Sequence, residues 1–488
     1  MSKVLVTNTY FYPLDPKQWH FKKPYPPLGT IQVSSLLKME GHDVRFFDNC
    51  LNGDPKRIDA VIKEFQPDYL IIYDDGFNYL TKMCLTAMRD AAYTMAGFGQ
   101  SAKAKVIISS SDASDRFDQY LENGADYVLM GEGDATVIEL LSTLNEGLAP
   151  NEVAGLAHID SSGKINKTIK RSVLQKLDDL PLAAWDLVDM EAYRKIWMTH
   201  HGYFSVNLAT TRGCPYKCNW CAKPIYGNRY NSRSPAHVIK EIRMLTQDYG
   251  VNHFWMCDDI FGLTPSWVQQ FKELVIENNL NFKYMIQSRV DLLLKEDTID
   301  VLVESGLETI WLGAESGSQH ILDAMDKGIT VEQIYEAVPK LQRKGVNVAL
   351  FLQFGYLGES LEDIYKTIDM VQEIMPEEIG ISVSYPLPGT KFYEKVKGDI
   401  QGKANWVDSD DLDLMFDNTY PPAFYKKLHR YVHNRHKLKR GLLALKQGVK
   451  SPSSLNKKNV RQILTTGYHL PMAVLNGAQL KILAKKQR

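Results

Sequence analysis

The sequence predicts an α/β protein made of an N-terminal doubly wound parallel sheet, a partial (β/α)6 barrel and a basic α-helical tail. Strand-like and helix-like stretches alternate along residues 1–150 and again along residues 201–400. Such alternation is typical of parallel strands joined by helices. Acidic residues stop at Asp417, whereas Lys and Arg continue to the end of the 488-residue chain. We therefore expect four segments: 1–150, a linker at 151–200, 201–400, and the tail at 401–488.

Residues 1–150 contain five stretches that predict strands: KVLVTNTY, HDVRFFDN, DYLIIYDD, AKVIISSS and ADYVLMGEG. Helical patterns lie between them, such as GTIQVSSLLKMEG, in which Gly41 predicts the helix end. This order predicts a doubly wound sheet, which binds ligands beyond the carboxyl ends of its strands. The residues expected at those ends are Asn8, Asp74, Asp75, Ser109–Ser111 and Gly131–Gly133.

Residues 201–400 predict a second, different set of strands. Pro235 and Gly250 mark the first turn and the end of one helix between them, SPAHVIKEIRMLTQDYG. Six strand–helix units indicate a partial barrel with its site at the carboxyl ends of the strands. The segment before it, 151–200, predicts a small β excursion and an acidic, proline-containing connector. The six strands are FSVNLATTR, NHFWMCDD, KYMIQSRV, TIWLGAES, NVALFLQFGY and GISVSYPL.

The composition indicates a globular protein of a reducing compartment. Apolar residues make up 44% and charged residues 24% of the chain, as in soluble domains. The start MSKVLVTNTYF predicts a strand and no signal peptide, and without a run of 18 apolar residues we expect no spanning helix. Six cysteines are too few for a disulfide scaffold, so we expect a cytoplasmic protein with metal or redox chemistry at any tight cysteine cluster.

Three of the six cysteines lie within eight residues, in the stretch TTRGCPYKCNWC. Thiolates of Cys214, Cys218 and Cys221 can converge from one loop onto a single centre. A structural zinc site normally takes four protein ligands, whereas three thiolates on a [4Fe–4S] cluster leave one iron open. Zinc with a distant His or Cys257 as the fourth ligand is the alternative.

The spacing Cys214-x3-Cys218-x2-Cys221, with Trp220 before the last cysteine, resembles the signature of the radical S-adenosylmethionine (SAM) superfamily. TTRGCP and PIYGNRYNSRSP resemble its subgroup with an N-terminal cobalamin-binding domain, and the resemblance extends from residue 1 to about 435. It implies that the three cysteines bind a [4Fe–4S] cluster whose open iron chelates SAM. The reduced cluster would cleave SAM to a 5′-deoxyadenosyl radical, which abstracts hydrogen from the substrate.

Further stretches resemble family motifs at the ends of barrel strands. They are WMCDDIF, QSRVD, GAESGSQHILDAMDKGIT and YPLPGTKFYEK, whereas FGYLGES has Leu357 where the family has proline. Two structural alternatives stay open: the two acids of WMCDDIF as a helix cap, and an ion pair between Glu315 and Arg289. The resemblance implies a SAM site that includes Trp220, Asp258, Asp259, Gln287, Arg289 and Glu315.

The front segment resembles the cobalamin-binding domain through KPYPPLGTIQVSSLL and ADYVLMGEGDATVIELL. Two features depart from the family. The Asp-x-His-x-x-Gly motif is absent, since Asp15 and His20 have another spacing, and Ser109–Ser111 replace two glycines. A serine Cβ narrows the approach of a ligand to the backbone. The alternative is a domain that serves only as a wall of the active site. The resemblance implies cobalamin-binding residues Asp74, Ser109, Ser110, Gly131 and Gly133.

Residues 418–488 hold sixteen Lys and Arg and no Asp or Glu. FYKKLHRYVHNRHKLKRGLLALKQG and MAVLNGAQLKILAKK predict helices. A helix with apolar and cationic faces binds anionic lipid surfaces, so we expect peripheral membrane contact, with docking onto the acidic body as the alternative. Interleaved stacking aromatics are missing, so nucleic acid is not an expected partner.

These patterns predict a cobalamin-dependent radical SAM enzyme that functionalises an unactivated carbon, by methyl transfer to a lipophilic or anionic small molecule. A flavodoxin- or ferredoxin-type protein is the expected reductant. Alternatives are an oxidative cyclase of the anaerobic magnesium-protoporphyrin ester type, which the tail resembles, an iron–sulfur electron carrier or sensor, and a zinc-stabilised binding module. Tyr216, Tyr226 and His253 are candidate bases, and the sequence assigns none of them.

Overall fold

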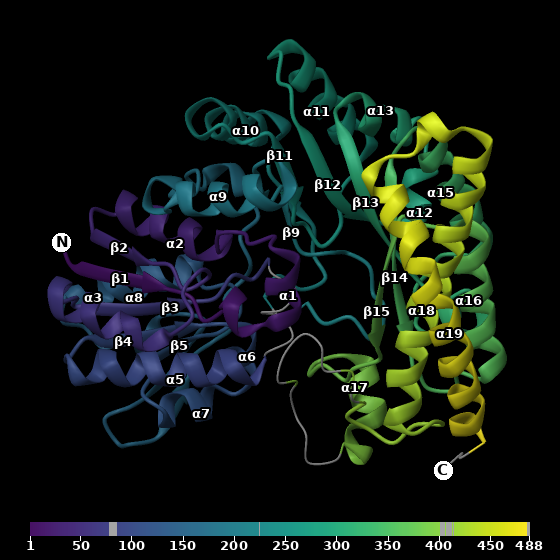
Figure 1. Ribbon diagram of the computed structural model, residues 1–488. Coiled ribbons are helices and arrows are strands. Elements are labelled where there is room, and N and C mark those ends of the chain that lie inside the picture. The colour runs from purple at the N-terminus through teal and green to yellow at the C-terminus, as the bar shows by residue number, and fades with distance from the viewer. Residues whose placement is uncertain (78–84, 224, 401–405, 407–411, 413, 486–488) are drawn as a thin grey trace. The chain divides into compact units, whose positions relative to one another are not determined.

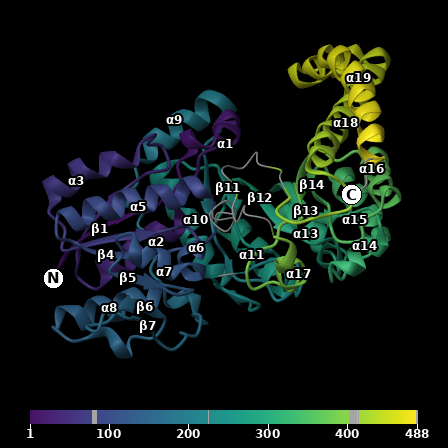
Figure 2. The ribbon, with the colours of Figure 1, turned by 90° about the horizontal axis from the view of Figure 1, so that it is seen from below.

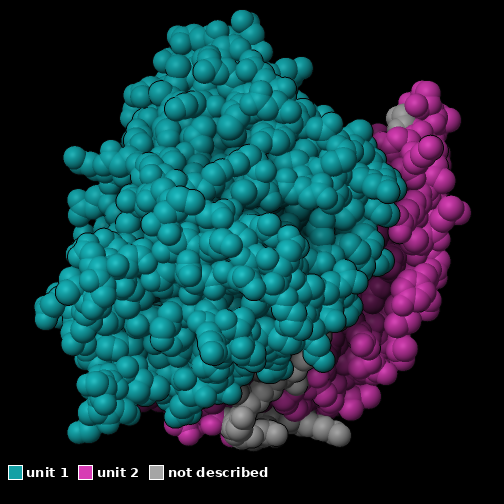
Figure 3. All heavy atoms as spheres, turned by 90° about the vertical axis from the view of Figure 1, so that its left-hand side faces the viewer, with its two compact units in different colours: residues 1–215, 222–286, 405–411 teal, residues 216–221, 287–404, 412–488 magenta. Residues whose placement is uncertain are grey.

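The computed structural model describes residues 1–77, 85–223, 225–400, 406, 412 and 414–485 (Figure 1). The chain forms two compact units, coloured in Figure 3. The first contains residues 1–215, 222–286 and 405–411, and the second contains 216–221, 287–404 and 412–488. These units divide the chain inside the predicted barrel, so the four-segment division stays a prediction.

A seven-stranded sheet forms the front part of the first unit, in the order β2-β1-β3-β4-β5-β6-β7. The first five strands are parallel, which confirms the doubly wound prediction, and β6 and β7 add antiparallel at one edge. The predicted β excursion therefore continues the front sheet. The strands are β1 (Lys3–Thr7), β2 (Asp43–Phe47), β3 (Tyr69–Tyr73), β4 (Lys105–Ser109), β5 (Tyr127–Leu129), β6 (Leu156–Ile159) and β7 (Ile165–Lys167).

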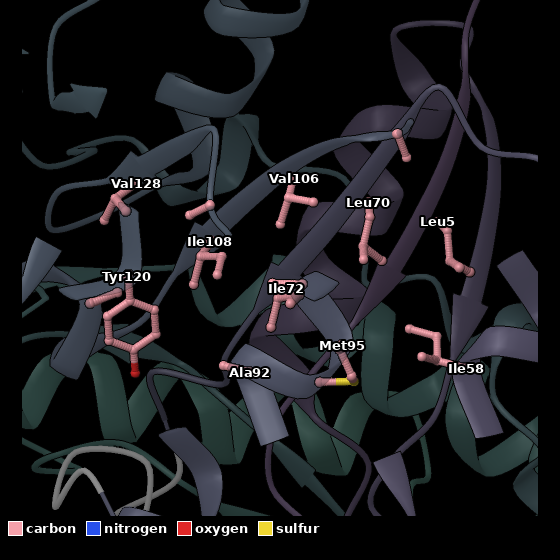
Figure 4. Close-up of a cluster of buried hydrophobic side chains, with 14 of the residues drawn as sticks. Leu5, Ile58, Leu70, Ile72, Ala92, Met95, Val106, Ile108, Tyr120 and Val128 are labelled. Atoms are coloured by element: carbon pink, nitrogen blue, oxygen red, sulfur yellow. The ribbon is translucent and has the colours of Figure 1, made fainter. Parts of the chain in front are cut away.

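Helices bury both faces of this sheet because successive strand residues point to opposite sides. Leu70 and Ile72 of β3 pack with α3 (Ile58–Phe65) and α5 (Thr86–Ser101) in the core shown in Figure 4. Ile71 of the same strand packs on the other face with α2 (Leu28–Met39) and α8 (Asp134–Asn145). The predicted end of α2 at Gly41 is confirmed, since Gly41 has a φ of +81° just beyond the helix. Short helices complete this part: α1 (Pro16–Phe21), α6 (Ser111–Asp115) and α7 (Phe117–Glu122).

The six strands of the predicted barrel come after the front sheet in the sequence. Strands β8 and β11 belong to the first unit, β12 begins there, and β13, β14 and β15 belong to the second. Helix α10 (Pro235–Tyr249) begins and ends as predicted: Ser234 caps it, Pro235 starts it and Gly250 ends it with a φ of +64°. The strand bounds are β8 (Ser205–Leu208), β11 (His253–Met256), β12 (Lys283–Ser288), β13 (Leu307–Glu315), β14 (Asn347–Phe354) and β15 (Glu378–Val383). Between and around them lie α9 (Met190–His201), β9 (Thr211–Arg212), β10 (Asn231–Ser232), α11 (Pro265–Glu277), α12 (Val290–Leu293), α13 (Thr298–Glu304), α14 (Gln319–Ala324), α15 (Val331–Arg343), α16 (Leu361–Ile374) and α17 (Lys391–Val396).

Two long helices end the second unit, α18 (Pro422–Lys450) and α19 (Lys457–Ala484). Both predicted tail helices are confirmed, and α19 is longer than its predicted core. Figures 1 and 2 both show α19 lying along α18. None of the helices in the described part of the chain combines the length and apolar content needed to cross a bilayer.

Candidate active site

The carboxyl ends of β3 and β4 bring several predicted site residues to one edge of the front sheet. Asp74 is buried and accepts hydrogen bonds from the backbone N–H (2.8 Å) and the hydroxyl (2.7 Å) of Thr9. Burial raises the pKa of Asp74 to about 6, against the lowering effect of these bonds. Asp74 therefore ties β3 to the segment that follows β1.

The serines that replace the family glycines also have internal roles. Ser110 caps α6 by accepting from the N–H of Ala113 at 2.8 Å, and Ser109 is buried. Gly131 has a φ of +79°, which favours glycine. A Cβ on Gly133 would lie 2.9 Å from the Ser109 hydroxyl oxygen, so close packing inside the protein explains that glycine. The structure thus gathers the predicted cobalamin residues, with the polar groups of Asp74 and Ser110 already engaged.

Arg212, in the TTRGCP stretch, is a buried cation that the sequence analysis did not single out. Its guanidinium pairs with Glu132 and with Asp134, the latter at 3.1 Å, both just after β5. It also lies over the rings of Phe77, at 5.9 Å, and Tyr226, at 5.3 Å. The strand that leads into the cysteine loop is therefore tied to the edge of the front sheet within the first unit.

Asp258 holds the same segment from the barrel side. Its carboxylate accepts from the backbone N–H groups of Thr210 (2.7 Å) and Thr211 (2.8 Å) and from the Thr210 hydroxyl. Burial raises its pKa to about 6. Asp258 is thus not a helix cap: its hydrogen bonds position the residues that precede Cys214, and its contact with SAM stays a prediction. Asp259 beside it is half-buried.

In the second unit, Arg289 places a positive charge at Cys218. Its Nη1 lies 4.0 Å from the Cys218 Sγ, and its guanidinium stacks 3.7 Å from the ring centroid of Tyr216. Arg289 is itself fixed by the carbonyl of Lys327 at 2.8 Å and by an ion pair with Asp291 at 2.9 Å. The guanidinium of Arg289 is thereby held beside one of the three thiols of the cysteine loop.

Glu315 pairs with Lys327, at 2.7 Å, and not with Arg289 as the structural alternative proposed. Both side chains are buried. Burial alone would lower the pKa of Lys327, but the charges of Glu315 and Cys218 outweigh it, so the pKa is raised. Glu315 has a φ of +58° at an irregularity of the β13–β14 register. A non-glycine residue in this region is strained, and such residues concentrate at functional sites.

Asn219 anchors the second half of the cysteine loop, and the sequence analysis missed it. Its backbone N–H donates to the carbonyl of Met325 (3.0 Å) and its side-chain amide to that of Ala324 (2.7 Å). Its amide oxygen accepts from the Tyr356 hydroxyl at 2.8 Å, and its carbonyl accepts from the N–H of Phe392 at 3.0 Å. Four bonds to α14, α17 and the end of β14 hold the residue between Cys218 and Cys221, although its partners are distant in sequence.

The remaining predicted residues are two members of the expected SAM site and the three candidate bases. Trp220 lies edge-on to Tyr385, and within the described contacts its buried indole N–H has no acceptor. Gln287 is half-buried near the end of β12. His253 begins β11, at the amino end of the strand; it bonds Ser205 at 2.8 Å, and burial lowers its pKa to about 4. Tyr216 and Tyr226 stack on Arg289 and Arg212. None of the three is placed as a base.

The donor set of the cysteine loop fits an iron–sulfur cluster. Cys214, Cys218 and Cys221 are partly exposed thiols without a disulfide. Cys214 belongs to the first unit and the other two to the second. In the described residues no three His, Cys, Asp or Glu side chains are arranged to hold a metal ion, so the ligand set rests on donor type and spacing.

Comparison with known proteins decides the nature of this loop. Residues 208–371 match the radical SAM superfamily. This chain contains a radical SAM domain. The domain begins at Leu208, at the end of β8, and includes Cys214, Arg289, Glu315 and Lys327.

Relatives of this chain match it well beyond the radical SAM domain. An uncharacterized methyltransferase of Pyrococcus horikoshii is 28% identical over 76% of this chain and 78% of its own. The anaerobic magnesium-protoporphyrin IX monomethyl ester cyclase of Rubrivivax gelatinosus is 24% identical over 76% of this chain and 66% of its own. The structure of the radical SAM methyltransferase TsrM from Kitasatospora setae, with cobalamin and a [4Fe–4S] cluster, matches with a TM-score of 0.67 at 18% identity, over 81% of this chain and 78% of that one. The likeness to TsrM concerns the fold.

Proposed function

We propose that this chain is a cobalamin-dependent radical SAM enzyme that transfers a methyl group to an unactivated carbon of a lipophilic or anionic small molecule. The observation that carries the proposal is Cys218, a thiol of the three-cysteine loop that faces Arg289 inside the radical SAM domain. When bound, a [4Fe–4S] cluster would supply the electron that cleaves SAM, and cobalamin would supply the methyl group.

The chain's own residues would hold and orient these groups. Cys214, Cys218 and Cys221 are the proposed cluster ligands, and Arg289 offsets the negative charge of the Cys218 sulfur. Glu315 offers a carboxylate for the SAM amino group, and Lys327 pairs with it in a buried place. Cobalamin is proposed at the carboxyl edge of the front sheet, without a role for Asp74 or Ser110, whose polar groups are engaged.

Anaerobic reconstitution tests the proposal directly. The reconstituted protein should contain four irons per chain, and under strong reductant it should convert SAM to 5′-deoxyadenosine and methionine, a result expected of about one cluster with an open iron. A coloured protein that leaves SAM intact would be an electron carrier or sensor. A colourless protein with zinc would be a binding module. Either outcome contradicts the proposal.

Ring formation by oxidation is the second candidate, because the Rubrivivax cyclase matches 76% of this chain. The two reactions differ in their products: methyl transfer adds a carbon, whereas cyclisation removes hydrogen. Comparison of metabolites between a deletion strain and its parent separates them, since a missing methyl group and a missing ring change the mass differently.

We also infer two partners. A flavodoxin- or ferredoxin-type protein is proposed as the electron donor, since SAM cleavage needs one electron for each turnover. A membrane surface is proposed as the working location of the enzyme. The charge of residues 418–488, with sixteen cations and no acid, supports that location.

A further inference from the structure

Helix α19 exposes a nearly continuous apolar face. Leu464 is 76% exposed and Val474 67% exposed, far above what isolated apolar side chains in a core helix show. Between Arg461 and Lys481 the sequence contains no Asp, Glu, Lys or Arg, and its one histidine, His469, is buried. We call this surface the outer face of α19 and define it as Val460, Leu464, Tyr468, Val474, Leu475 and Ile482.

The opposite face of α19 is the one that packs in the second unit. His469, Ala473, Asn476 and Leu480 are its buried residues. His469 bonds the side chain of Asn434 on α18 at 2.8 Å, and a Cβ on Gly477 would lie 2.9 Å from the Tyr431 ring. The outer face is therefore a second apolar surface in addition to the one that α19 uses for folding. Exposed patches of this kind mark interaction sites.

The cations of the tail fall into two groups, those that bind the rest of the second unit and those that lie beyond it. Arg440 of α18 (2.8 Å) and Lys458 of α19 both form ion pairs with Glu377, and Lys439 donates to the carbonyl of Gln372. Phe424, Leu428 and Val432 are buried, so the predicted docking of this helix onto the body is the arrangement within the second unit. Exposed cations also lie beyond this docked part, near the turn between the helices or toward the far end of α19, and four of them are Lys446, Lys450, Arg461 and Lys481.

We propose that the outer face of α19 inserts into the interfacial layer of an anionic lipid bilayer, with these four cations on the headgroups. This inference rests on the proposed membrane location and names the surface responsible. Interfacial helices combine such an apolar face with flanking Lys and Arg, and lie in the membrane plane without crossing it. A second copy of the chain fits less well, since residues 418–488 would bring cations to cations with no acid to meet them.

Vesicle flotation of the full chain tests the inference. The wild type should float with vesicles of mixed phosphatidylglycerol and phosphatidylcholine and bind pure phosphatidylcholine weakly. Leu464→Glu combined with Val474→Glu should weaken binding at least about tenfold, because two inserted side chains become charged. Lys446→Gln with Lys450→Gln should weaken it about 30-fold at low salt, from the attraction of each cation to the anionic surface.

Ile169→Glu is the matched control, since Ile169 is 78% exposed and lies on the first unit. It should float like the wild type. Failure of the wild type to float at low salt, or unchanged flotation of the Leu464/Val474 variant, overturns the inference. If the wild type forms a dimer that the Leu464/Val474 variant does not form, and the wild type does not bind vesicles, the outer face of α19 contacts a second copy of the chain. This result also overturns the inference. SAM cleavage without substrate is measured in parallel, so failure of the proposed enzyme activity shows separately from failure of membrane binding.

Discussion

The edge of the front sheet and the region around Cys218 both place acids at the ends of parallel strands, yet those acids serve different purposes. At the front edge, Asp74 binds Thr9, and Asp112 pairs with Arg89 at 2.6 Å, so both carboxylates connect neighbouring chain segments. Near Cys218, Glu315 is held in a strained conformation and meets a lysine whose pKa also responds to the cysteine. The position of an acid at a strand end does not reveal its role; its partners do.

The cysteine loop is held at its two ends by side chains of both kinds: connectors of chain segments at its entry, and residues around Cys218 in its second half. Its entry is fixed by Asp258 and Arg212, which act as connectors in the first unit. Its second half is fixed by Asn219 in the second unit, where the guanidinium of Arg289 lies beside Cys218. Substitutions in the first group should change stability, and those in the second should change the cluster.

The largest effect is expected from Cys218→Ser. The hydroxyl is a poor ligand for iron, so the reconstituted variant should lose its cluster and all SAM cleavage. Iron analysis and detection of 5′-deoxyadenosine measure both. Cys50→Ser is the control, because Cys50 is a buried thiol of the front domain that accepts from Asn8. Equal loss in the two variants would mean that folding, and not ligation, had failed.

Arg212→Met should cause the largest loss of stability without removing a ligand. It leaves Glu132 and Asp134 buried without their cation, which costs about 3–5 kcal/mol of unfolding free energy. Urea unfolding of the protein measures this loss. Lys63→Met removes an exposed ion pair with Asp59 and should cost less than about 1 kcal/mol. If both variants unfold at the same urea concentration, Arg212 does not connect the loop to the sheet.

Glu359→Gln should change how stability depends on pH. Glu359 follows β14 and, unlike Glu315, has no cation among its described contacts; burial raises its pKa to about 8. Because its ordinary pKa is 4.5, the folded state retains the proton between about pH 4.5 and 8, where the unfolded state loses it. Its contribution to stability is therefore full below pH 4.5 and is lost as the pH rises through 8.

The glutamine variant cannot lose a proton, so this part of the pH dependence should disappear. Thermal unfolding between pH 5 and 9 should show that the free energy of unfolding of the wild type decreases more toward alkaline pH than that of Glu359→Gln. The expected difference is about 1 kcal/mol for each pH unit, summed over a few units. Parallel curves for the two proteins would show that Glu359 ionises normally. Glu315→Gln, measured alongside, removes the partner of the buried Lys327 and should instead lower stability across this pH range.

Much of the fold was predictable because its signals are local. Alternating apolar stretches gave the strands, and Pro235 and Gly250 gave both ends of α10. The three cysteines were predictable for the same reason, as their spacing is short. The roles of Asp258 and Glu315 were not, because Thr210 lies 48 residues from Asp258 and the choice of Lys327 over Arg289 depends on the turn after α14.

Asn219 shows the limit of sequence reasoning most clearly. Its side-chain partners Ala324 and Tyr356 are 105 and 137 positions away, so no sequence pattern near CNWC indicates that Asn219 fixes the loop. The tail had a similar difficulty: both helices are amphipathic in the sequence. Only packing reveals that the first half of α18 buries Phe424, Leu428 and Val432, while its second half, like α19, exposes apolar residues.

Asn219→Ala should loosen the cluster without abolishing it. It removes the side-chain bonds to Ala324 and Tyr356, each of about 1 kcal/mol, so a chelator should strip iron about 30-fold faster. Asn219→Asp keeps the acceptor for Tyr356 and should be intermediate. Asn123→Ala on the surface of the front domain is the control. Iron release as slow as in the wild type would remove Asn219 from the loop's support.

Ser110→Ala should have the smallest effect and bears on the front edge alone. The change removes the cap of α6, and about 1 kcal/mol of stability with it. Because the Ser110 hydroxyl already binds Ala113, we expect cobalamin affinity, followed by visible spectroscopy of titrated protein, to stay within about twofold of the wild type. A much weaker affinity at unchanged stability would mean that Ser110 turns to the cofactor. The front edge would then resemble the Cys218 region more than its internal bonds indicate.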